Sequence, residues 1–482
     1  MKNRFIYTYL FLLSLLFTGC QDWLDVSPKS EVRADDLFST EAGFRDALMG
    51  VYTVMNQKEM YGAFETCLMD CFGGLVQSCG VSSTFMLNMD MESATLRSGF
   101  ASMWSKHYSC ILNLNELLEY LEKADRSIFS PGVFELLKGE ALALRGFLHL
   151  DLIRMWGPVS TTDNLGRPSV PYYRQAGVTA QPAQTLSDAI RMAIEDLEAG
   201  RAVLRESDPI LKEDWEHNAF VTSTSSTGIT LSGDDYENLG FFLYRNYRIN
   251  YYAATAAIAR AYHHVGNSAE AARYAREVID SGKFPLIDSG ETGSMGYWLM
   301  KEAMFQLYKR DLEKEIAIKY YEKESTAETT NNKLVLYRSS IFDRDAAISR
   351  DWRAIYLFSG NQFNRFYHGG SAMPVLRVSE MYLIAAEAEN DFGYLNTLRA
   401  HRGWEGIEYS HENHDLAEEI EVEYMREFLG EGQAYYYYKR TGKAQLLVSP
   451  NRNHTVLFDL EYPDSELEFG NVTPKEQESK AS

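Results

Sequence analysis

The sequence predicts a mostly α-helical protein built from tetratricopeptide-like helical pairs, with long inserted loops and a few short strands. Two observations carry this prediction. Apolar residues recur at steps of three and four along several stretches, which is the period of a helix with one buried face. Two stretches, near residues 260 and 385, are rich in alanine, and small side chains let the two helices of a pair approach closely.

The first long helices are predicted from apolar spacing alone. One helix is predicted from apolar residues that recur at steps of three and four, which are Phe100, Trp104, Tyr108, Ile111, Leu114 and Leu118. A second helix runs from Leu144 to Met155 and stops at Gly157-Pro158, because proline cannot continue a helix. A third covers Ile190 to Leu197 and begins near Ser187 or Asp188.

Two segments look like complete helical pairs. Tyr251 to Ile279 has an alanine-rich helix, a turn at Gly266-Asn267 and a second alanine-rich helix. Its span is close to the tetratricopeptide period of about 34 residues. Leu376 to Arg399 is a second such unit, with its turn predicted at Phe392-Gly393. We expect these pairs to stack as a solenoid.

The non-helical segments are predicted from turn-forming and β-branched residues. The expected insertions are 158–182, 220–233 with a possible hairpin, 285–296, and 325–338, which ends in the β-like Leu334 to Tyr337. The polar tail after Pro450 is expected to be extended.

The amino terminus predicts export and lipid anchoring. Lys2 and Arg4 precede an apolar run, Phe5 to Phe17, which has the build of a signal peptide. Leu16 to Cys20 then resembles a bacterial lipobox, in which the cysteine carries the acyl chains. We expect a lipoprotein signal peptide over 1–19 and one helical domain over 20–482. An ordinary cleaved signal with a chance cysteine is the alternative.

The net charge of the chain limits the kinds of ligand that it can bind. The formal net charge is −21 at pH 7. This charge opposes binding to phosphate backbones, so we expect no nucleic-acid partner, and it suits a neutral ligand. Solubility alone would also explain the charge.

No catalytic, metal or cofactor motif is apparent. Cys67, Cys71, Cys79 and Cys110 lack the spacing of a metal site, and we expect buried free thiols, although disulfides are allowed after export. The carboxylates near 420, which are Glu418, Glu419, Glu421 and Glu423, are expected to face water. The chain has no phosphate-binding loop and no hydrolase or metalloprotease signature. We therefore expect no enzymatic activity and no cofactor.

Several separated motifs resemble the SusD/RagB family of nutrient-binding lipoproteins. Leu24 to Pro28 matches the segment after the lipid-bearing cysteine. The most specific matches are Leu137 to Val159, and Arg426 to Gly432 with Lys439-Arg440. Pro463 to Glu466 resembles the closing segment. The resemblance covers nearly all of the mature chain.

The resemblance implies a SusD-like fold and a binding protein that sits on a SusC-like TonB-dependent transporter at the outer membrane. Members of the family bind oligosaccharides, and some take peptides. Within the matching helices, the charged residues are expected to form structural ion pairs or caps; these are Glu140, Arg145, Glu431 and Arg440. The aromatic residues there are expected in the core; these are Trp104, Tyr108, Phe147 and Trp156.

Ligand-binding residues are expected on the irregular loops, which can vary without disturbing the helical stack. Sugar rings stack on aromatic faces, and amide or charged groups bind their hydroxyls. The candidates are Phe85, Asn88, Asp90, Tyr297, Trp298, Trp352, Asn361 and Phe363. Packing in the core is the alternative for every aromatic, and the family resemblance makes the Asp-x-Arg element around Trp352 structural.

The predicted function is capture of an oligosaccharide or polysaccharide at the cell surface, anchored through Cys20, and its delivery to the transporter. A peptide-binding member of the same family is the nearest alternative. An exported glycoside hydrolase and a scaffold without a small ligand are the others.

Overall fold

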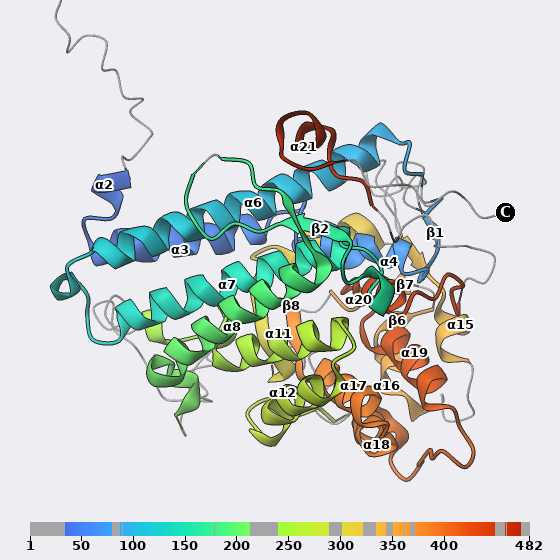
Figure 1. The fold of residues 1–482 in the computed structure, drawn as a ribbon. Coiled ribbons are helices and arrows are strands. Elements are labelled where there is room, and N and C mark those ends of the chain that lie inside the picture. Colours follow the sequence, from blue (N-terminus) through green and yellow to red (C-terminus); the bar gives the residue numbers. More distant parts are fainter. Residues whose placement is uncertain are drawn as a thin grey trace, which may run out of the picture.

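Long helices lie side by side in a curved stack, and a smaller group of helices and short strands lies at one end of it (Figure 1). The computed structural model describes residues 34–79, 87–88, 90–177, 179–212, 240–288, 301–321, 334–343, 350–360, 362–366, 372–448, 458 and 460–473. Residues 1–33, which contain Cys20, and the expected hairpin at 220–233 lie outside this set.

The amino-terminal half of the stack is formed by helices α2 (Ala34–Leu37), α3 (Glu41–Met55), α4 (Met69–Phe72), α6 (Ala94–Lys123), α7 (Val133–Trp156) and α8 (Leu186–Ser207). The predictions for α6 and α7 are confirmed, including the end of α7 before Gly157. Helix α8 begins at Leu186, just before the predicted start, because the Thr185 hydroxyl caps it by accepting from the Asp188 amide.

Glycines set the spacing between α7 and α8. A Cβ on Gly146 would lie 2.8 Å from the Ala193 carbonyl oxygen, and one on Gly200 would lie 2.6 Å from the Gly139 carbonyl oxygen. The two backbones are therefore closer than any larger residue would permit.

The first predicted pair is confirmed as α11 (Tyr251–His264) and α12 (Ser268–Asp280). Asn250 and Asn267 cap the two helices, and Gly266 makes the turn with a φ of +72°. The second pair is α17 (Val378–Glu389) and α18 (Phe392–Arg399).

The predicted turn of the second pair at Phe392-Gly393 is wrong by two residues. Asn390 adopts a left-handed φ of 53°, and the Asp391 carboxylate accepts from the Gly393 amide at 2.7 Å. The turn is therefore Asn390-Asp391, and α18 begins at Phe392, because asparagine tolerates this backbone and aspartate caps a helix.

The strands of the described residues form four antiparallel pairs. They are β1 (Val76–Cys79) with β5 (Leu334–Leu336), β2 (Pro168–Pro171) with β3 (Ala183–Thr185), β4 (Ala303–Tyr308) with β8 (Ala372–Arg377), and β6 (Phe358–Ser359) with β7 (Gln362–Phe363). The β-like residues from Leu334 and the irregular segment after Pro158 are thus confirmed.

The carboxyl-terminal helices are α15 (Arg338–Phe342), α16 (Trp352–Tyr356), α19 (Leu416–Glu427), α20 (Gln433–Thr441) and α21 (Asp464–Phe469). Short turns of π-helix occur at Phe64–Leu68, Glu313–Tyr321 and Ala400–Trp404. Short 3₁₀ turns occur at Arg126–Ile128, Thr162–Asn164, Pro209–Leu211, Gly240–Phe242 and Arg245–Tyr247. The expectation of a fully extended tail is wrong at α21, where Glu466 accepts from the Trp104 indole at 3.3 Å and holds a helical turn against α6.

The core runs through the whole stack as one hydrophobic cluster. Trp104, Phe147 and Trp156 are buried in it as predicted, whereas Tyr108 is partly buried. No helix in the described part of the chain has the length and apolar character to cross a bilayer.

Candidate functional site

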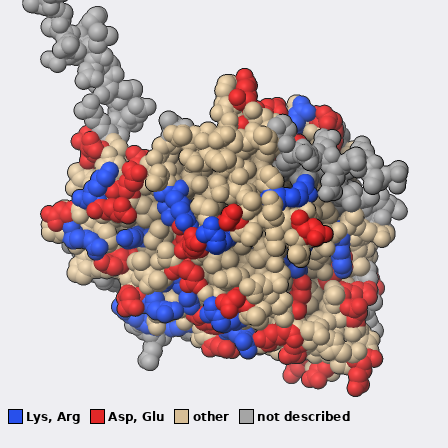
Figure 2. All heavy atoms as spheres, in the orientation of Figure 1, with Lys and Arg blue, Asp and Glu red and all other residues tan. Residues whose placement is uncertain are grey.

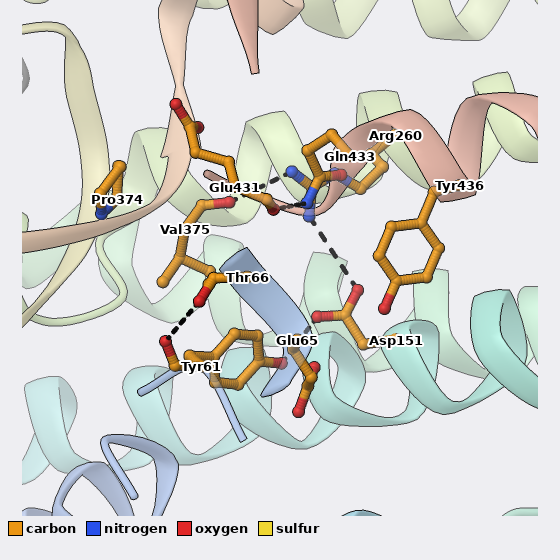
Figure 3. Close-up of a pocket in the computed structure, with 10 residues that line it drawn as sticks. All are labelled: Tyr61, Glu65, Thr66, Asp151, Arg260, Pro374, Val375, Glu431, Gln433 and Tyr436. Carbon is orange, nitrogen blue, oxygen red and sulfur yellow. Dashed lines mark hydrogen bonds and ion pairs between the residues drawn. The ribbon is translucent and has the colours of Figure 1, made fainter. Parts of the chain in front are cut away.

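A polar cavity lies where the amino-terminal and carboxyl-terminal halves meet (Figure 3). Residues from α7, α11, β8 and the segments around α4 and α20 surround it, and they are Tyr61, Glu65, Thr66, Asp151, Arg260, Pro374, Val375, Glu431, Gln433 and Tyr436. The cavity thus contains charged groups from both halves of the chain.

The charges around the cavity are paired with one another. Asp151 accepts from the Tyr61 hydroxyl at 2.6 Å and from Arg154 at 2.9 Å. Arg260 donates two hydrogen bonds to Glu380, at 2.7 and 2.6 Å. Each guanidinium therefore has a carboxylate partner, which is the condition for burying it.

Glu65 also lines the cavity, and its surroundings shift its pKa upward. Burial raises the pKa of Glu65 well above its usual range, and the nearby Asp151 charge adds to the effect. Its Oε1 lies 3.5 Å from Nε2 of His107, whose pKa burial lowers. His107 Nδ1 lies 2.9 Å from the Met103 carbonyl oxygen and donates to it, so Nε2 faces the Glu65 carboxyl as an acceptor.

The cavity is too small for a sugar. It has room for about one water molecule. No cluster of three metal-ligating side chains occurs among the residues that the structure describes. The polar cavity is therefore a structural feature of the interior, and a ligand must bind elsewhere.

A second buried polar group, the arginine cluster, consists of Arg353, Arg377 and Arg402 around Glu427. The Glu427 carboxylate accepts from Arg377 and Arg402 at 2.7 Å and from Arg353 at 2.8 Å. The three guanidiniums hold the pKa of Glu427 well below its usual range, against the effect of burial. The cluster joins α16, β8 and α19, and so fixes the frame from which the carboxyl-terminal loops leave.

The expectation that the carboxylates near 420 face water is wrong for two of the four. Glu423 is fully buried and accepts from Arg353 at 2.6 Å and Arg399 at 2.7 Å. Glu421 is buried beside Lys443, at 2.7 Å. The partners come from distant segments, which the spacing along one helix cannot reveal.

The expected structural ion pairs are confirmed. Glu140 pairs with Arg245, and Arg145 with Asp196 at 2.8 Å. Glu431 pairs with Arg377 at 2.8 Å, and Arg440 with Glu387 at 2.7 Å. Cys67, Cys71, Cys79 and Cys110 are free thiols, of which Cys79 is partly exposed and the others are buried.

The predicted ligand residues fall into three groups. Phe85, Tyr297, Trp298 and Asn361 lie outside the described residues. Asn88 and Asp90 are exposed at the surface, next to the start of α6. Trp352 and Phe363 are buried, each with 1% of its surface exposed.

Trp352 and Phe363 pack in the core, so neither ring has an exposed face on which a sugar could stack. The Trp352 indole donates to the His401 carbonyl oxygen at 2.7 Å. The Phe363 ring lies against Tyr321, with ring centroids 5.0 Å apart. The Asp-x-Arg element is structural, since Asp351 and Arg353 pair at 2.8 Å.

Among the described residues, the exposed large aromatic side chains are Tyr308 at 57%, Tyr356 at 44% and Phe469 at 76%, and none of them is among the ligand residues predicted from the sequence. Tyr308 ends a buried strand and precedes Lys309, Arg310 and Asp311. An aromatic at a strand end before a run of charges is a signal that could have found it.

Comparisons with known proteins cover most of the chain. The model of a family described as starch-binding and associating with the outer membrane matches residues 22–216, and the SusD family model matches residues 260–477. A SusD-like protein of Formosa agariphila is 21% identical over 165 residues, which are 33% of this chain and 31% of that protein. The matched stretch thus spans about a third of that relative.

Solved structures share the fold over nearly the full length. A SusD superfamily protein of Bacteroides thetaiotaomicron superposes with a TM-score of 0.69 at 22% identity, covering 91% of this chain and 100% of that one. Surface glycan-binding protein A of the same organism gives 0.66 at 15% identity, covering 92% and 100%. A SusD-like carbohydrate binding protein of Bacteroides vulgatus gives 0.62 at 19%, covering 83% of each.

The helical frame, the two family-model matches and the similar solved structures all indicate the same family. Proteins of this family bind their ligands without catalysis, in agreement with the lack of a catalytic motif in the sequence. The chain belongs to the SusD/RagB family of outer-membrane-associated proteins.

Proposed function

We propose that this chain is a cell-surface lipoprotein that binds an oligosaccharide or polysaccharide and delivers it to a SusC-like TonB-dependent transporter. The observation that carries the proposal is the family match, whose first model is described as starch-binding and associating with the outer membrane. The neighbours named as glycan-binding or carbohydrate-binding proteins support the same class of ligand.

The charge of the chain favours a neutral glycan over an acidic one. The net charge is −21, and on the face in Figure 2 acidic side chains gather at the lower right, with basic ones spread over the left and centre. A polyanionic ligand would be repelled by such a protein. A neutral sugar is bound instead by ring stacking and hydrogen bonds, which a negative net charge leaves intact.

The ligand site is expected on the outside of the frame. The polar cavity has room for about one water molecule, so it excludes even a single sugar ring. The exposed Asn88 and Asp90 are available for hydrogen bonds to hydroxyls. Phe85, Tyr297, Trp298 and Asn361 remain proposed ligand residues.

Binding is tested with the full chain carrying Cys20→Ala, which is expected to be released from the membrane. Native electrophoresis through gels containing soluble starch, xylan, galactomannan or laminarin measures retardation, and reducing-sugar release is measured in parallel. We expect retardation in at least one gel, without sugar release. Release of sugar would support a hydrolase, and binding to peptides alone would overturn the glycan proposal.

The anchor and the delivery step have separate tests. Wild-type protein is expected in the outer-membrane fraction with a lipid label, and the Cys20→Ala variant in the soluble fraction. A Cys20→Ala variant that kept its lipid label would refute the anchor. Deletion of the gene should abolish uptake of the bound glycan, labelled with a fluorophore, and unchanged uptake would refute delivery.

A further inference from the structure

We infer that Tyr308 and Tyr247 form a sugar-stacking surface for a neutral oligosaccharide, an inference that rests on the proposed function. Tyr308 is the last residue of β4 and has 57% of its surface exposed. The Tyr247 ring lies edge-on to it, with the centroids 6.1 Å apart and the ring planes at 69°. Among the exposed large apolar residues of the described chain, Tyr308 has a second ring beside it.

The strand holds Tyr308 in a fixed position. Tyr308 pairs with Ala372 at the end of the β4–β8 ladder, and its carbonyl oxygen accepts from the Asn56 side-chain amide. Lys309 donates to the Asn56 carbonyl oxygen at 3.3 Å. The backbone below the exposed ring is therefore fixed from two sides, which lowers the entropic cost of binding a ligand.

Tyr247 is held by a buried ion pair. It lies in the short turn Arg245–Tyr247, and Arg245, 1% exposed, donates to both oxygens of Asp208 at 2.8 and 2.9 Å. The next helix is joined to the strand, because the Asn250 amide donates to the Met304 carbonyl oxygen at 2.7 Å. The two rings thus sit on parts of the frame that are tied together.

The backbone before Tyr247 is strained in a way that fixes this turn. Tyr244 has a φ of 53°, in the left-handed region, which residues other than glycine rarely adopt. Its carbonyl oxygen accepts from the Tyr247 amide at 2.9 Å. Burial raises the pKa of Tyr247 to about 12, so its hydroxyl is neutral at physiological pH.

The chemistry beside the rings suits a hydroxylated, uncharged ligand. The exposed face of Tyr308 offers an apolar surface for the C–H groups of a pyranose ring. Lys309 follows Tyr308 in the chain and is partly exposed, and its ammonium group can donate to sugar hydroxyls. A site with one ring face and a few hydrogen-bonding groups matches a short stretch of a neutral glycan.

The inference is tested with Tyr308→Ala, in the full chain carrying Cys20→Ala, against whichever of the four gel polysaccharides retards the parent protein most. We expect Tyr308→Ala to raise the dissociation constant about tenfold, since it removes the ring face. Tyr308→Phe keeps that face and should bind within about twofold of the parent. Phe469→Ala removes an exposed ring elsewhere and is the matched control, with unchanged affinity expected.

The outcomes separate this inference from the proposed function. If the parent bound a polysaccharide and Tyr308→Ala bound it equally, the stacking surface would be refuted and the proposed function would stand. If the parent bound none of the four, both would fall. Thermal unfolding of each variant shows that a loss of affinity is local, because truncating an exposed side chain should leave the midpoint within about 2 °C.

Discussion

Glu427 and Glu65 are both almost completely buried, at 2% and 4% exposure, yet the pKa of Glu427 is lowered and that of Glu65 is raised. Glu427 lies among three guanidiniums in the arginine cluster, which lower its pKa despite burial. Glu65 faces a neutral histidine beside the polar cavity, and burial together with Asp151 raises its pKa. Similar burial therefore accompanies opposite pKa shifts, and the identity of the neighbours decides the direction.

The largest effect is expected from Glu427→Gln. The variant leaves Arg353, Arg377 and Arg402 with less compensating charge in the interior, and we expect the free energy of unfolding to fall by about 3–5 kcal/mol. Urea denaturation at pH 7 measures it. A loss below about 1 kcal/mol would mean that the arginine cluster is far better solvated than its burial indicates.

The second prediction concerns the loss of stability at low pH that Glu423 causes. Arg353 and Arg399 lower the pKa of Glu423 to about 2, against burial, whereas in the unfolded chain it is about 4.3. A lowered folded-state pKa adds stability above about pH 4.3 that is lost as the pH falls toward 2.

We therefore expect Glu423 to contribute a loss of about 2 kcal/mol between pH 6 and pH 3. The unfolding free energy of wild type and Glu423→Gln across this range measures it. The variant should be less stable at pH 6 and should lose less on acidification. Parallel pH curves for the two proteins would contradict the assignment.

A smaller effect of opposite sign is expected at the polar cavity. Because the folded-state pKa of Glu65 is raised, its contribution is complete below about pH 4.3 and is lost as the pH rises. Glu65→Gln is neutral at every pH and can donate to His107 Nε2. We expect it to match wild type at pH 4 and to be more stable than wild type at pH 8. Destabilisation at pH 8 would show that the folded-state pKa of Glu65 is not raised.

The smallest effect is expected at the surface and calibrates the others. Arg97 and Glu92 form an exposed pair at 3.4 Å, with 51% and 93% of their side chains exposed. Arg97→Ala should change the unfolding free energy by less than about 0.5 kcal/mol, because water screens the pair. A change of several kcal/mol would show that charge removal itself, and not burial, dominates the Glu427→Gln result.

Local structure was predictable where neighbouring residues decide it. The apolar period gave α6 and α7, and the alanine-rich segments with Gly266 gave the α11–α12 pair, because a helix depends on contacts three and four residues apart. Even here, the start of α8 and the turn at Asn390 were displaced, since capping side chains and not apolar residues set the ends.

The candidate site was less predictable, because exposure depends on the whole fold. Trp352 and Phe363 carry polar neighbours in the sequence, yet both are packed in the core. Tyr308 ends a strand whose other residues are buried, yet its own side chain is exposed. The order of polar and apolar residues in a short segment does not reveal which other segments of the fold cover it.

The sequence by itself determined the helical period, the family motifs and the acidic charge of this protein. The tertiary structure decided the direction in which the pKa values of Glu427 and Glu65 shift, and which rings face water. Asp70 accepts from the Gly430 amide at 2.6 Å across 360 residues, and Glu423 meets Arg353 across 70. Such partners are brought together by packing and not by spacing along the chain, and in an interior of low dielectric constant nearby charges strongly influence the pKa of a buried group.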